Sequence, residues 1–253
     1  MLQHILFKHF HDLTEDAINV EYQTHTTQTD GHASIREVLQ RAHERQLRAI
    51  AFTEHVRRST DWFADFARNV RAEAAQFPDL TVYVGCEAKA LNTNGGLDVS
   101  DEVRAQCEIV LGSVHTFPKQ YGKFDDYDKT NPQDARRFAE IECELALGLL
   151  KYAPIDVLAH PGGMYQKRFG KFPDDLFREM MLATRVQNVA IEISSSYLYD
   201  FPAFLRLCDE INPIVSIGSD VHELDHVARC RDTLRQLRIN NYELRMGTNT
   251  ASP

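Results

Sequence analysis

The sequence predicts an α/β domain folded as a TIM-like barrel, (β/α)7, in which seven parallel strands are surrounded by helices. Seven runs of apolar and β-branched residues alternate along the chain with amphipathic helical segments, a pattern typical of a parallel sheet covered by helices. The chain has 253 residues, 43% of them hydrophobic, which suffices for one large core. Seven repeats over about 220 residues can close a barrel. An open doubly wound sheet is the alternative.

The predicted strands are runs rich in Val, Ile and Ala that lie between polar segments. They cover residues 18–24, 48–53, 81–86, 108–113, 155–159, 188–193 and 213–218. The first helix is predicted at 34–47, where Ser34 and Glu37 fit a capping box and an apolar stripe follows at helical spacing. Further helices are predicted at 61–76, 135–152, 174–186, 201–211 and 225–238.

The two ends of the chain differ from the repeats between them. Residues 1–17 have apolar side chains at helical spacing, which predicts an extra helix packed on the outside. The barrel domain is expected to span 18–240. The last residues, 241–253, are polar and are expected to form a tail.

Charge, cysteine content and the absence of certain motifs make several classes of function unfavourable. The 37 acidic and 28 basic side chains give a formal charge of −9, which repels a phosphate backbone and disfavours extended nucleic-acid binding. Five Cys without CxxC spacing predict free thiols in a reduced, cytoplasmic setting. No run approaches the roughly 18 apolar residues of a membrane span, and no signal sequence is expected. The nucleotide-fold and serine-hydrolase motifs GxGxxG, Walker-type loop and GxSxG are absent.

Residues able to bind metal ions stand at the carboxyl end of nearly every predicted strand. They are His25, Glu54, His55, Glu87, His115, His160, Asp220 and His222, with Glu192 inside the sixth strand. Parallel barrels assemble their active sites at this end. A single His in an apolar run is more often a core residue, but many buried imidazoles and carboxylates together need compensating partners. We therefore predict a metal cluster.

The predicted ligands are imidazole and carboxylate groups, without thiolate. This set favours an open catalytic site that accepts zinc, manganese or iron. Clustered divalent ions acidify bound water and clamp the oxygens of a phosphoryl group. Hydrolysis of a phosphate ester is the reaction that these residues indicate.

Seven segments resemble, in order and in spacing, the signature segments of the PHP (polymerase and histidinol phosphatase) family. They are THTTQTDG, AFTEH, GCE, GSVH, LAHPGG, IEISS and GSDVH. The resemblance extends from about Val20 to Leu237. It implies a distorted seven-stranded barrel, a centre that usually holds three divalent metals, and the hydrolysis of phosphoesters.

The resemblance also implies a ligand for each position. It assigns a first metal to Gln23, His25, Glu87 and Asp220, a second to Glu87, His115 and His160, and a third to Asp30, His55 and His222. It implies further that a hydroxide bridging the first two ions attacks phosphorus. Glu87, Asp220 and His222 are the residues expected to be catalytic.

The sequence departs from the family pattern at two positions. Gln23 stands where most members have His, and Glu54 stands where many have Asp. A neutral amide is a weaker ligand than imidazole for zinc-like ions. Gln23 would therefore ligate weakly, hydrogen-bond a metal-bound water, or leave the first metal loosely held, so we expect two to three ions of Zn, Mn or Fe. Glu54 and Glu192 are expected to orient ligands through hydrogen bonds.

A phosphate dianion also needs cationic side chains, preferably arginine. Candidates in the loops after ligand-bearing strands are Arg57, Arg58, Lys119, Lys167 and Arg168. Among these, Arg168 is the first choice for substrate binding, followed by Lys119 and Arg57. The long insert between GSVH and LAHPGG resembles the histidinol-phosphatase branch of the family.

The sequence thus predicts a metal-dependent phosphoesterase that acts on a small phosphorylated metabolite, a phosphomonoester such as histidinol phosphate or a similar compound. A noncatalytic metal-binding module is one alternative, motivated by Gln23. A nuclease acting on short oligonucleotides is another, and the charge of −9 offers it little support. No partner beyond the small substrate is predicted.

Overall fold

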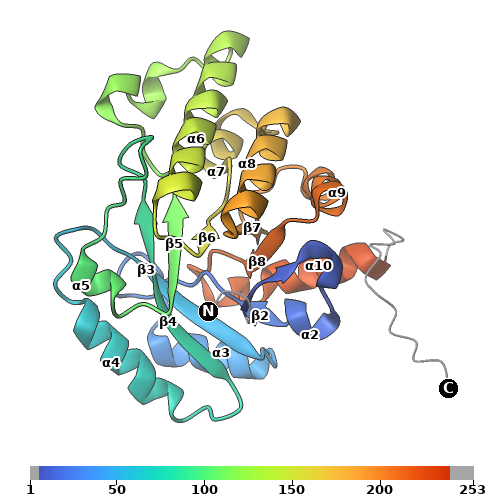
Figure 1. Ribbon diagram of the computed structural model, residues 1–253. Helices are drawn as coiled ribbons and strands as arrows, with labels where there is room; N and C mark the ends of the chain where they lie inside the picture. Colours follow the sequence, from blue (N-terminus) through green and yellow to red (C-terminus); the bar gives the residue numbers. More distant parts are fainter. Residues whose placement is uncertain (1–5, 240–253) are drawn as a thin grey trace.

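One sheet of eight strands lies at the centre of the computed structural model, which describes residues 6–239 (Figure 1). The strands are β1 (Lys8–His9), β2 (Val20–Glu21), β3 (Ala49–His55), β4 (Thr81–Lys89), β5 (Ile109–Ser113), β6 (Val157–Leu158), β7 (Ala190–Ser194) and β8 (Ile214–Gly218). Their order is β1-β8-β7-β6-β5-β4-β3-β2. Neighbours from β2 to β8 are parallel, and β1 joins β8 antiparallel.

The seven parallel strands close into a barrel because the segment after β2 pairs with the end of β8. The backbone N–H of Tyr22 donates to the carbonyl of Ile217 at 2.9 Å. Further along, the N–H of His25 donates to Val221 at 2.8 Å, and the N–H of Val221 donates to Gln23 at 3.0 Å. The predicted TIM-like barrel is thus confirmed, and the open doubly wound sheet is wrong.

Helices cover the outside of the barrel, with α3 and α4 on one side in Figure 1 and α6, α8 and α9 on the other. The helices are α2 (Glu15–Ile18), α3 (Ile35–Glu44), α4 (Phe63–Ala74), α5 (Asp101–Arg104), α6 (Pro132–Tyr152), α7 (Gly163–Phe169), α8 (Asp174–Gln187), α9 (Phe201–Ile211) and α10 (Arg229–Ile239). Short 3-10 turns are η1 (Phe10–Asp12), η2 (Lys119–Tyr121), η3 (Phe124–Asp126) and η4 (Leu224–His226). All seven predicted strands and all six predicted barrel helices are present.

Local sequence explains where several of these elements begin. The predicted capping box of α3 is confirmed, since the Ser34 hydroxyl accepts from the N–H of Glu37 at 3.3 Å and the Glu37 carboxylate accepts from the N–H of Ser34 at 2.8 Å. In α6, Asn131 caps the N-terminus and Pro132 occupies the first turn. Helices α5 and α7 were not predicted, because α5 is a single turn and α7 begins in the glycine pair Gly162–Gly163.

Of the extra helix predicted for residues 1–17, the structure shows Leu6 as helical, but the prediction is wrong for residues 7–14. Residues 8–9 form β1, which pairs with the start of β8, and α2 begins only after Thr14, whose hydroxyl accepts from the N–H of Ala17 at 3.1 Å. The edge of β8 offers backbone hydrogen bonds that the apolar spacing alone cannot reveal. The polar tail predicted for 241–253 lies outside the described residues.

The end of the barrel where the strands terminate is polar although it is buried. Its fully or almost fully buried polar side chains are Glu21, Gln23, His25, Glu54, Glu87, His160, Glu192 and Asp220. Such groups are retained inside a protein only when they have partners. Among the helices that the structure describes, none has the length and apolar character that a membrane span requires.

Glu142 is a buried carboxyl group that joins α6 to α7. Its two oxygens accept from the backbone N–H groups of Met164 at 3.1 Å and Tyr165 at 2.8 Å. Burial raises the pKa of Glu142 from 4.5 to about 8. The folded state therefore keeps a proton that the unfolded chain releases, so this group favours folding at low pH and loses that effect as the pH rises to about 8.

We expect Glu142→Gln to flatten the pH dependence of stability. Between pH 5 and pH 8 the wild type should lose on the order of 2–4 kcal/mol more unfolding free energy than the variant. Urea unfolding at both pH values measures the difference. Glu179→Gln, at an exposed position on α8, is the matched control. If the unfolding free energies of all three proteins changed equally with pH, the raised pKa of Glu142 would be contradicted.

Candidate metal centre

Glu87, on β4, lies at the centre of a cluster of imidazoles. Its Oε1 lies 3.0 Å from His115 Nε2 and 2.8 Å from His160 Nε2. Its Oε2 lies 3.3 Å from His25 Nε2 and 3.4 Å from His55 Nδ1. The strand register explains part of this arrangement, because His55 of β3 pairs directly with Glu87. One buried carboxylate thus faces four imidazole rings that come from four different strand ends.

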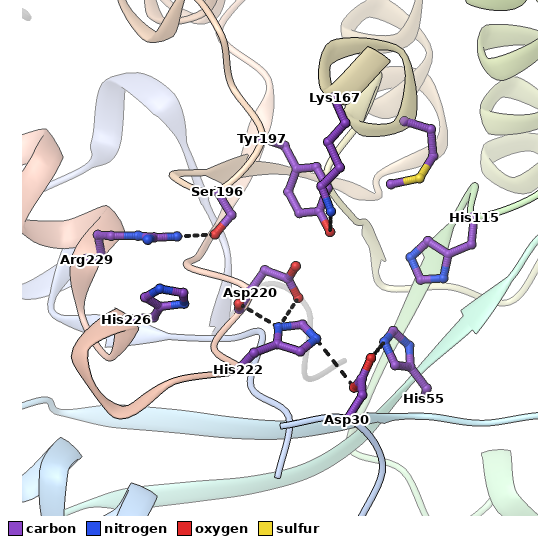
Figure 2. Close-up of a pocket in the computed structure, with 11 residues that line it drawn as sticks. Asp30, His55, His115, Lys167, Ser196, Tyr197, Asp220, His222, His226 and Arg229 are labelled. Carbon is purple, nitrogen blue, oxygen red and sulfur yellow. Dashed lines mark hydrogen bonds and ion pairs between the residues drawn. The ribbon is translucent and has the colours of Figure 1, made fainter. Parts of the chain in front are cut away.

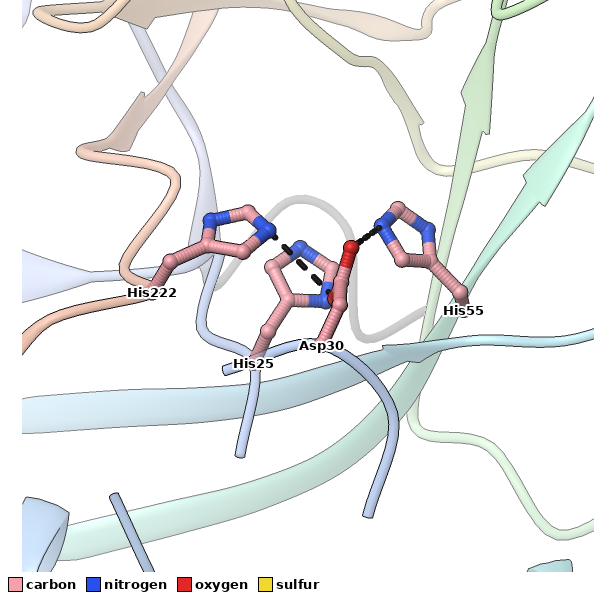
Figure 3. Close-up of side chains that lie close together, drawn as sticks. All are labelled: His25, Asp30, His55 and His222. Atoms are coloured by element: carbon pink, nitrogen blue, oxygen red, sulfur yellow. Dashed lines mark ion pairs between the residues drawn. The ribbon is translucent and has the colours of Figure 1, made fainter. Parts of the chain in front are cut away.

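Two aspartates extend the cluster toward the solvent. Asp220 Oδ1 lies 3.1 Å from His25 Nε2 and 3.6 Å from His222 Nδ1. The oxygens of Asp30 each lie 3.4 Å from an imidazole nitrogen, one on His55 and one on His222. Figure 3 shows Asp30 between the rings of His55 and His222, with His25 beside it.

The ligand-capable atoms fall into three groups, and within each group they lie no more than 4.8 Å apart. The groups are His25, Asp30, His55 and His222; His55, Glu87 and His115; and His25, Glu87 and Asp220. His160 reaches both Glu87 and His115, since its Nε2 lies 3.2 Å from the Nε2 of His115. All the predicted His, Asp and Glu ligands are therefore brought together, while their allocation to individual ions stays a prediction.

The chemistry of this donor set fits divalent cations. Both ring nitrogens of His25 are buried: Nδ1 has no hydrogen-bond partner among the described residues, and Nε2 faces the carboxylate oxygens of Glu87 and Asp220. The Nε2 atoms of His115 and His160 face each other, an arrangement that a shared cation would satisfy. Burial lowers the pKa of His55 to about 4, so this imidazole is neutral and has a lone pair to offer. Burial opposes ionisation of Glu87, but His115 and His160 hold its pKa well below the usual value.

Glu54 holds the loop that carries Asp30. Its Oε1 accepts from the backbone N–H of Thr26 at 2.9 Å and from the hydroxyl of Thr26 at 2.5 Å. Its Oε2 accepts from the hydroxyl of Thr29, the neighbour of Asp30. Glu54 thus shapes the path of the chain from β2 to Asp30 instead of contacting an imidazole ring.

Two candidate ligands have a left-handed backbone, with φ of 28° at His160 and 50° at Asp220. Strained conformations of this kind persist only where the surroundings hold them. Glu192 accepts from the backbone N–H of His160 at 2.7 Å, and Glu21 accepts from the N–H of Ser219 at 2.7 Å. Glu192 was expected to orient an imidazole through its ring nitrogen, but it contacts the backbone of the ligand.

Gln23 contacts the central carboxylate. Its Nε2 donates to Glu87 Oε2 at 3.1 Å, and its buried Oε1 has no hydrogen-bond partner among the described residues. A carboxylate accepts hydrogen bonds and the amide nitrogen donates them, so this orientation of the amide is the favourable one. The carbonyl oxygen stays available as a ligand atom, and the amide also fixes the position of Glu87, a role that was not among the expected ones.

A cavity of about 490 Å³ opens over the cluster (Figure 2). Its cationic side chains are Lys167 from α7 and Arg229 from α10. Lys167 Nζ donates to the hydroxyl of Tyr197 at 3.0 Å and lies 4.1 Å from the centroid of that ring, which stacks on His160. Arg229 donates to the hydroxyl of Ser196.

The structure does not place Arg168 or Lys119 in the lining of this cavity. The guanidinium of Arg168 instead donates to the carboxylate of Asp125 and the carbonyl of Tyr127, both at 3.0 Å. Residues 167 and 168 are adjacent on a helix, so their side chains point about 100° apart. The third cation expected to bind substrate, Arg57, lines two hollows beside the cluster.

Arg229 was missed because it lies seven residues beyond His222, at the start of a helix. The loop after β8 returns its chain to the same end of the barrel, and only that return places Arg229 over the site. Its position after the last ligand-bearing strand could have indicated it, because the predicted cations were taken from the loops that follow the earlier ligand-bearing strands.

Comparison with known proteins identifies the family. The PHP domain model matches residues 21–196. A probable phosphatase of Caldicellulosiruptor bescii is 24% identical over 227 residues, which cover 85% of this chain and 85% of the relative. Another from Caldicellulosiruptor saccharolyticus is 24% identical over 238 residues, covering 89% and 88%.

Among solved structures, the histidinol phosphate phosphatase of Lactococcus lactis, complexed with zinc, L-histidinol and phosphate, superposes with a TM-score of 0.64. The match covers 87% of this chain and 92% of that one at 17% identity, and it shows a shared fold. The family model, the relatives and the ligand cluster agree. The chain therefore belongs to the PHP domain family and is a metal-dependent phosphoesterase.

Proposed function

We propose that this chain hydrolyses a small phosphomonoester. The observation that carries the proposal is the cluster centred on Glu87, which opens into a cavity with Lys167 and Arg229 on its walls. A cavity of about 490 Å³ suits a small metabolite better than a polymer. The Lactococcus lactis relative, complexed with L-histidinol and phosphate, supports a phosphomonoester of that size.

Two to three divalent ions, Zn, Mn or Fe, would be held by the His, Asp and Glu residues of the cluster, with Gln23 as a further carbonyl ligand. Bound there, the ions would acidify water and neutralise phosphate oxygens. Glu87 and Asp220 contribute by staying ionised, because neighbouring imidazoles lower the pKa of both carboxyl groups against the effect of burial. They are the proposed catalytic residues together with His222, which lines the cavity.

Lys167 and Arg229 would bind the phosphate oxygens that the ions leave free. Each is held in place by a neighbour, Lys167 by the hydroxyl and ring of Tyr197 and Arg229 by the hydroxyl of Ser196. Such contacts reduce the entropy lost when a long side chain orders around a ligand. Charge-assisted hydrogen bonds from both walls would then fix the ester over the cluster.

The experiment that tests this function is phosphate release by the purified protein supplied separately with Zn, Mn and Fe(II). The esters to compare are p-nitrophenyl phosphate, histidinol phosphate, the diester bis(p-nitrophenyl) phosphate and a short oligonucleotide. We expect hydrolysis of at least one of the two monoesters, and slower or no cleavage of the diester and the oligonucleotide. Bound metal without turnover of any ester would support the noncatalytic alternative, and preferred cleavage of the oligonucleotide would support a nuclease; either result overturns the proposal.

Replacing Lys167 by Met should lower kcat/KM for monoesters about 10- to 100-fold, the effect of losing one charge-assisted hydrogen bond. Steady-state kinetics measures it. Lys151→Met, at an exposed position on α6, is the matched control and should behave as wild type. An unchanged kcat/KM in Lys167→Met would remove this residue from the site.

A further inference from the structure

A second hollow, of about 250 Å³, adjoins the metal cluster on the side of β3, β4 and β5. Three of its lining residues are candidate metal ligands, and His55 and His115 line the main cavity as well. The rest of its wall includes Arg57, Lys89 and Thr116. The two spaces therefore border the same two imidazoles, and a ligand bound over the cluster lies next to the second hollow.

Strand pairing explains why two cations lie together here. In the register of β3 and β4, His55 is opposite Glu87, and the N–H of Val56 continues the ladder by donating to the carbonyl of Glu87 at 3.0 Å. Residues two apart on an extended chain face the same side. Arg57 and Lys89 thus follow His55 and Glu87 by one step on the cluster side, and both reach the hollow.

The guanidinium of Arg57 has no ion pair or hydrogen bond with any residue that the structure describes. The contact of Arg57 is through its backbone, whose N–H donates to the hydroxyl of Thr60 at 2.9 Å. By contrast, Arg36, Arg136 and Arg178 each contact a carboxylate. In a chain with a net charge of −9, an arginine without an acidic partner beside a metal cluster is available for an anion.

Lys89 is also only weakly neutralised. Its Nζ lies 3.9 Å from Asp98 Oδ2, at the limit of an ion pair. The other oxygen of Asp98 accepts from the backbone N–H of Arg58 at 3.0 Å. The hollow therefore has two cations and one hydroxyl, while its carboxylate, Glu87, is already surrounded by imidazoles.

We propose that Arg57, Lys89 and Thr116 bind a second anionic group of the substrate, a carboxylate or another phosphate, while the phosphate to be cleaved lies over the metal cluster. This deepens the proposed function and rests on it. The substrate is then a phosphomonoester with an additional negative group a few bonds from the ester. An amine in this position would meet two positive charges, so cationic esters such as histidinol phosphate are poor substrates.

Matched pairs of esters test the subsite. For the carboxylate, 3-phosphoglycerate is compared with glycerol 3-phosphate; for the phosphate, fructose 1,6-bisphosphate is compared with fructose 6-phosphate. In at least one pair, kcat/KM should be about 10-fold or more higher for the member with the additional anion. The pair that responds identifies the group. Dissociation constants from calorimetry make the same comparison independent of turnover.

Variants connect the preference to these side chains. Arg57→Gln and Lys89→Gln should each reduce the ratio of kcat/KM within the responding pair about 10-fold. Arg206→Gln, an equal loss of charge at an exposed position on α9, should leave the ratio unchanged. Metal content and thermal unfolding of each variant confirm that the cluster and the fold are intact.

The outcomes separate the two proposals. Without hydrolysis of any ester, p-nitrophenyl phosphate included, the proposed function fails, and calorimetry still decides the subsite. With hydrolysis but ratios near one, or ratios that Arg57→Gln and Lys89→Gln leave unchanged, the function stands and the subsite is wrong. A preference for histidinol phosphate also overturns the subsite. The amine of that ester would then bind in the neighbouring hollow that Asp30 and Asp61 line.

Discussion

Replacing Glu87 by Gln is expected to lower kcat/KM by about 10³-fold or more, since the change removes charge where the ions would be held. No other side chain of the cluster has as many partners: imidazole nitrogens of His25, His55, His115 and His160 lie within 3.4 Å of its two oxygens. Gln retains the shape of the side chain but offers one carbonyl oxygen and a donor that opposes imidazole N–H groups.

Metal content distinguishes this effect from a general disturbance of the site. Glu87→Gln should lose more bound metal than Asp30→Asn, because Glu87 belongs to two of the three ligand groups and Asp30 to one. Elemental analysis after dialysis measures both variants, and circular dichroism checks their folding. Equal metal loss in the two variants would show that the assumed sharing of Glu87 is wrong.

Removing divalent ions with a chelator should abolish hydrolysis and also destabilise the protein. Ions that bind the folded chain alone stabilise it by about 2.7 kcal/mol at a free concentration 100 times Kd. Without them, the buried imidazoles and carboxylates of the cluster mainly face one another, as the contacts of Glu87 with four imidazoles show. Burial lowers the pKa of His25, but Asp220 and Glu87 raise it well above its usual value, so metal binding must displace a proton there.

Thermal unfolding before and after chelation measures this stabilisation, and adding back Zn, Mn or Fe(II) should restore both stability and turnover. Because protons compete with the ions, restoration should need more metal at pH 5.5 than at pH 7.5. Glu87→Gln is the control and should respond weakly to added metal. Unchanged unfolding together with retained hydrolysis would contradict a metal-dependent reaction.

The contact of Gln23 with Glu87 explains how this chain can lack the His that most family members have at this position. Its amide nitrogen donates to Glu87, so the position supports the central carboxylate even without an imidazole. A His at this position could add a ligand but would lose that donor when it binds a metal through the same nitrogen. The departure from the family pattern is thus compatible with an intact cluster.

Much of the fold and of the ligand cluster could be predicted from the sequence, because the patterns that indicate them are local and repeat along the chain. Alternating strands and helices indicate a parallel sheet covered by helices, and parallel strands bring their carboxyl ends to one edge. Residues such as His55, Glu87 and His115 at those ends must therefore lie together. Their residue types then indicate divalent ions without any knowledge of distances.

Other features were decided only by tertiary structure, since they depend on how elements rotate and pack. Lys167 and not Arg168 faces the main cavity because α7 is held in one orientation by Glu142. Residues 8–9 form a strand because the edge of β8 offers backbone groups with which they pair. Side-chain direction on a short helix and pairing between distant segments arise from contacts across the whole chain, which periodicity along the sequence does not contain.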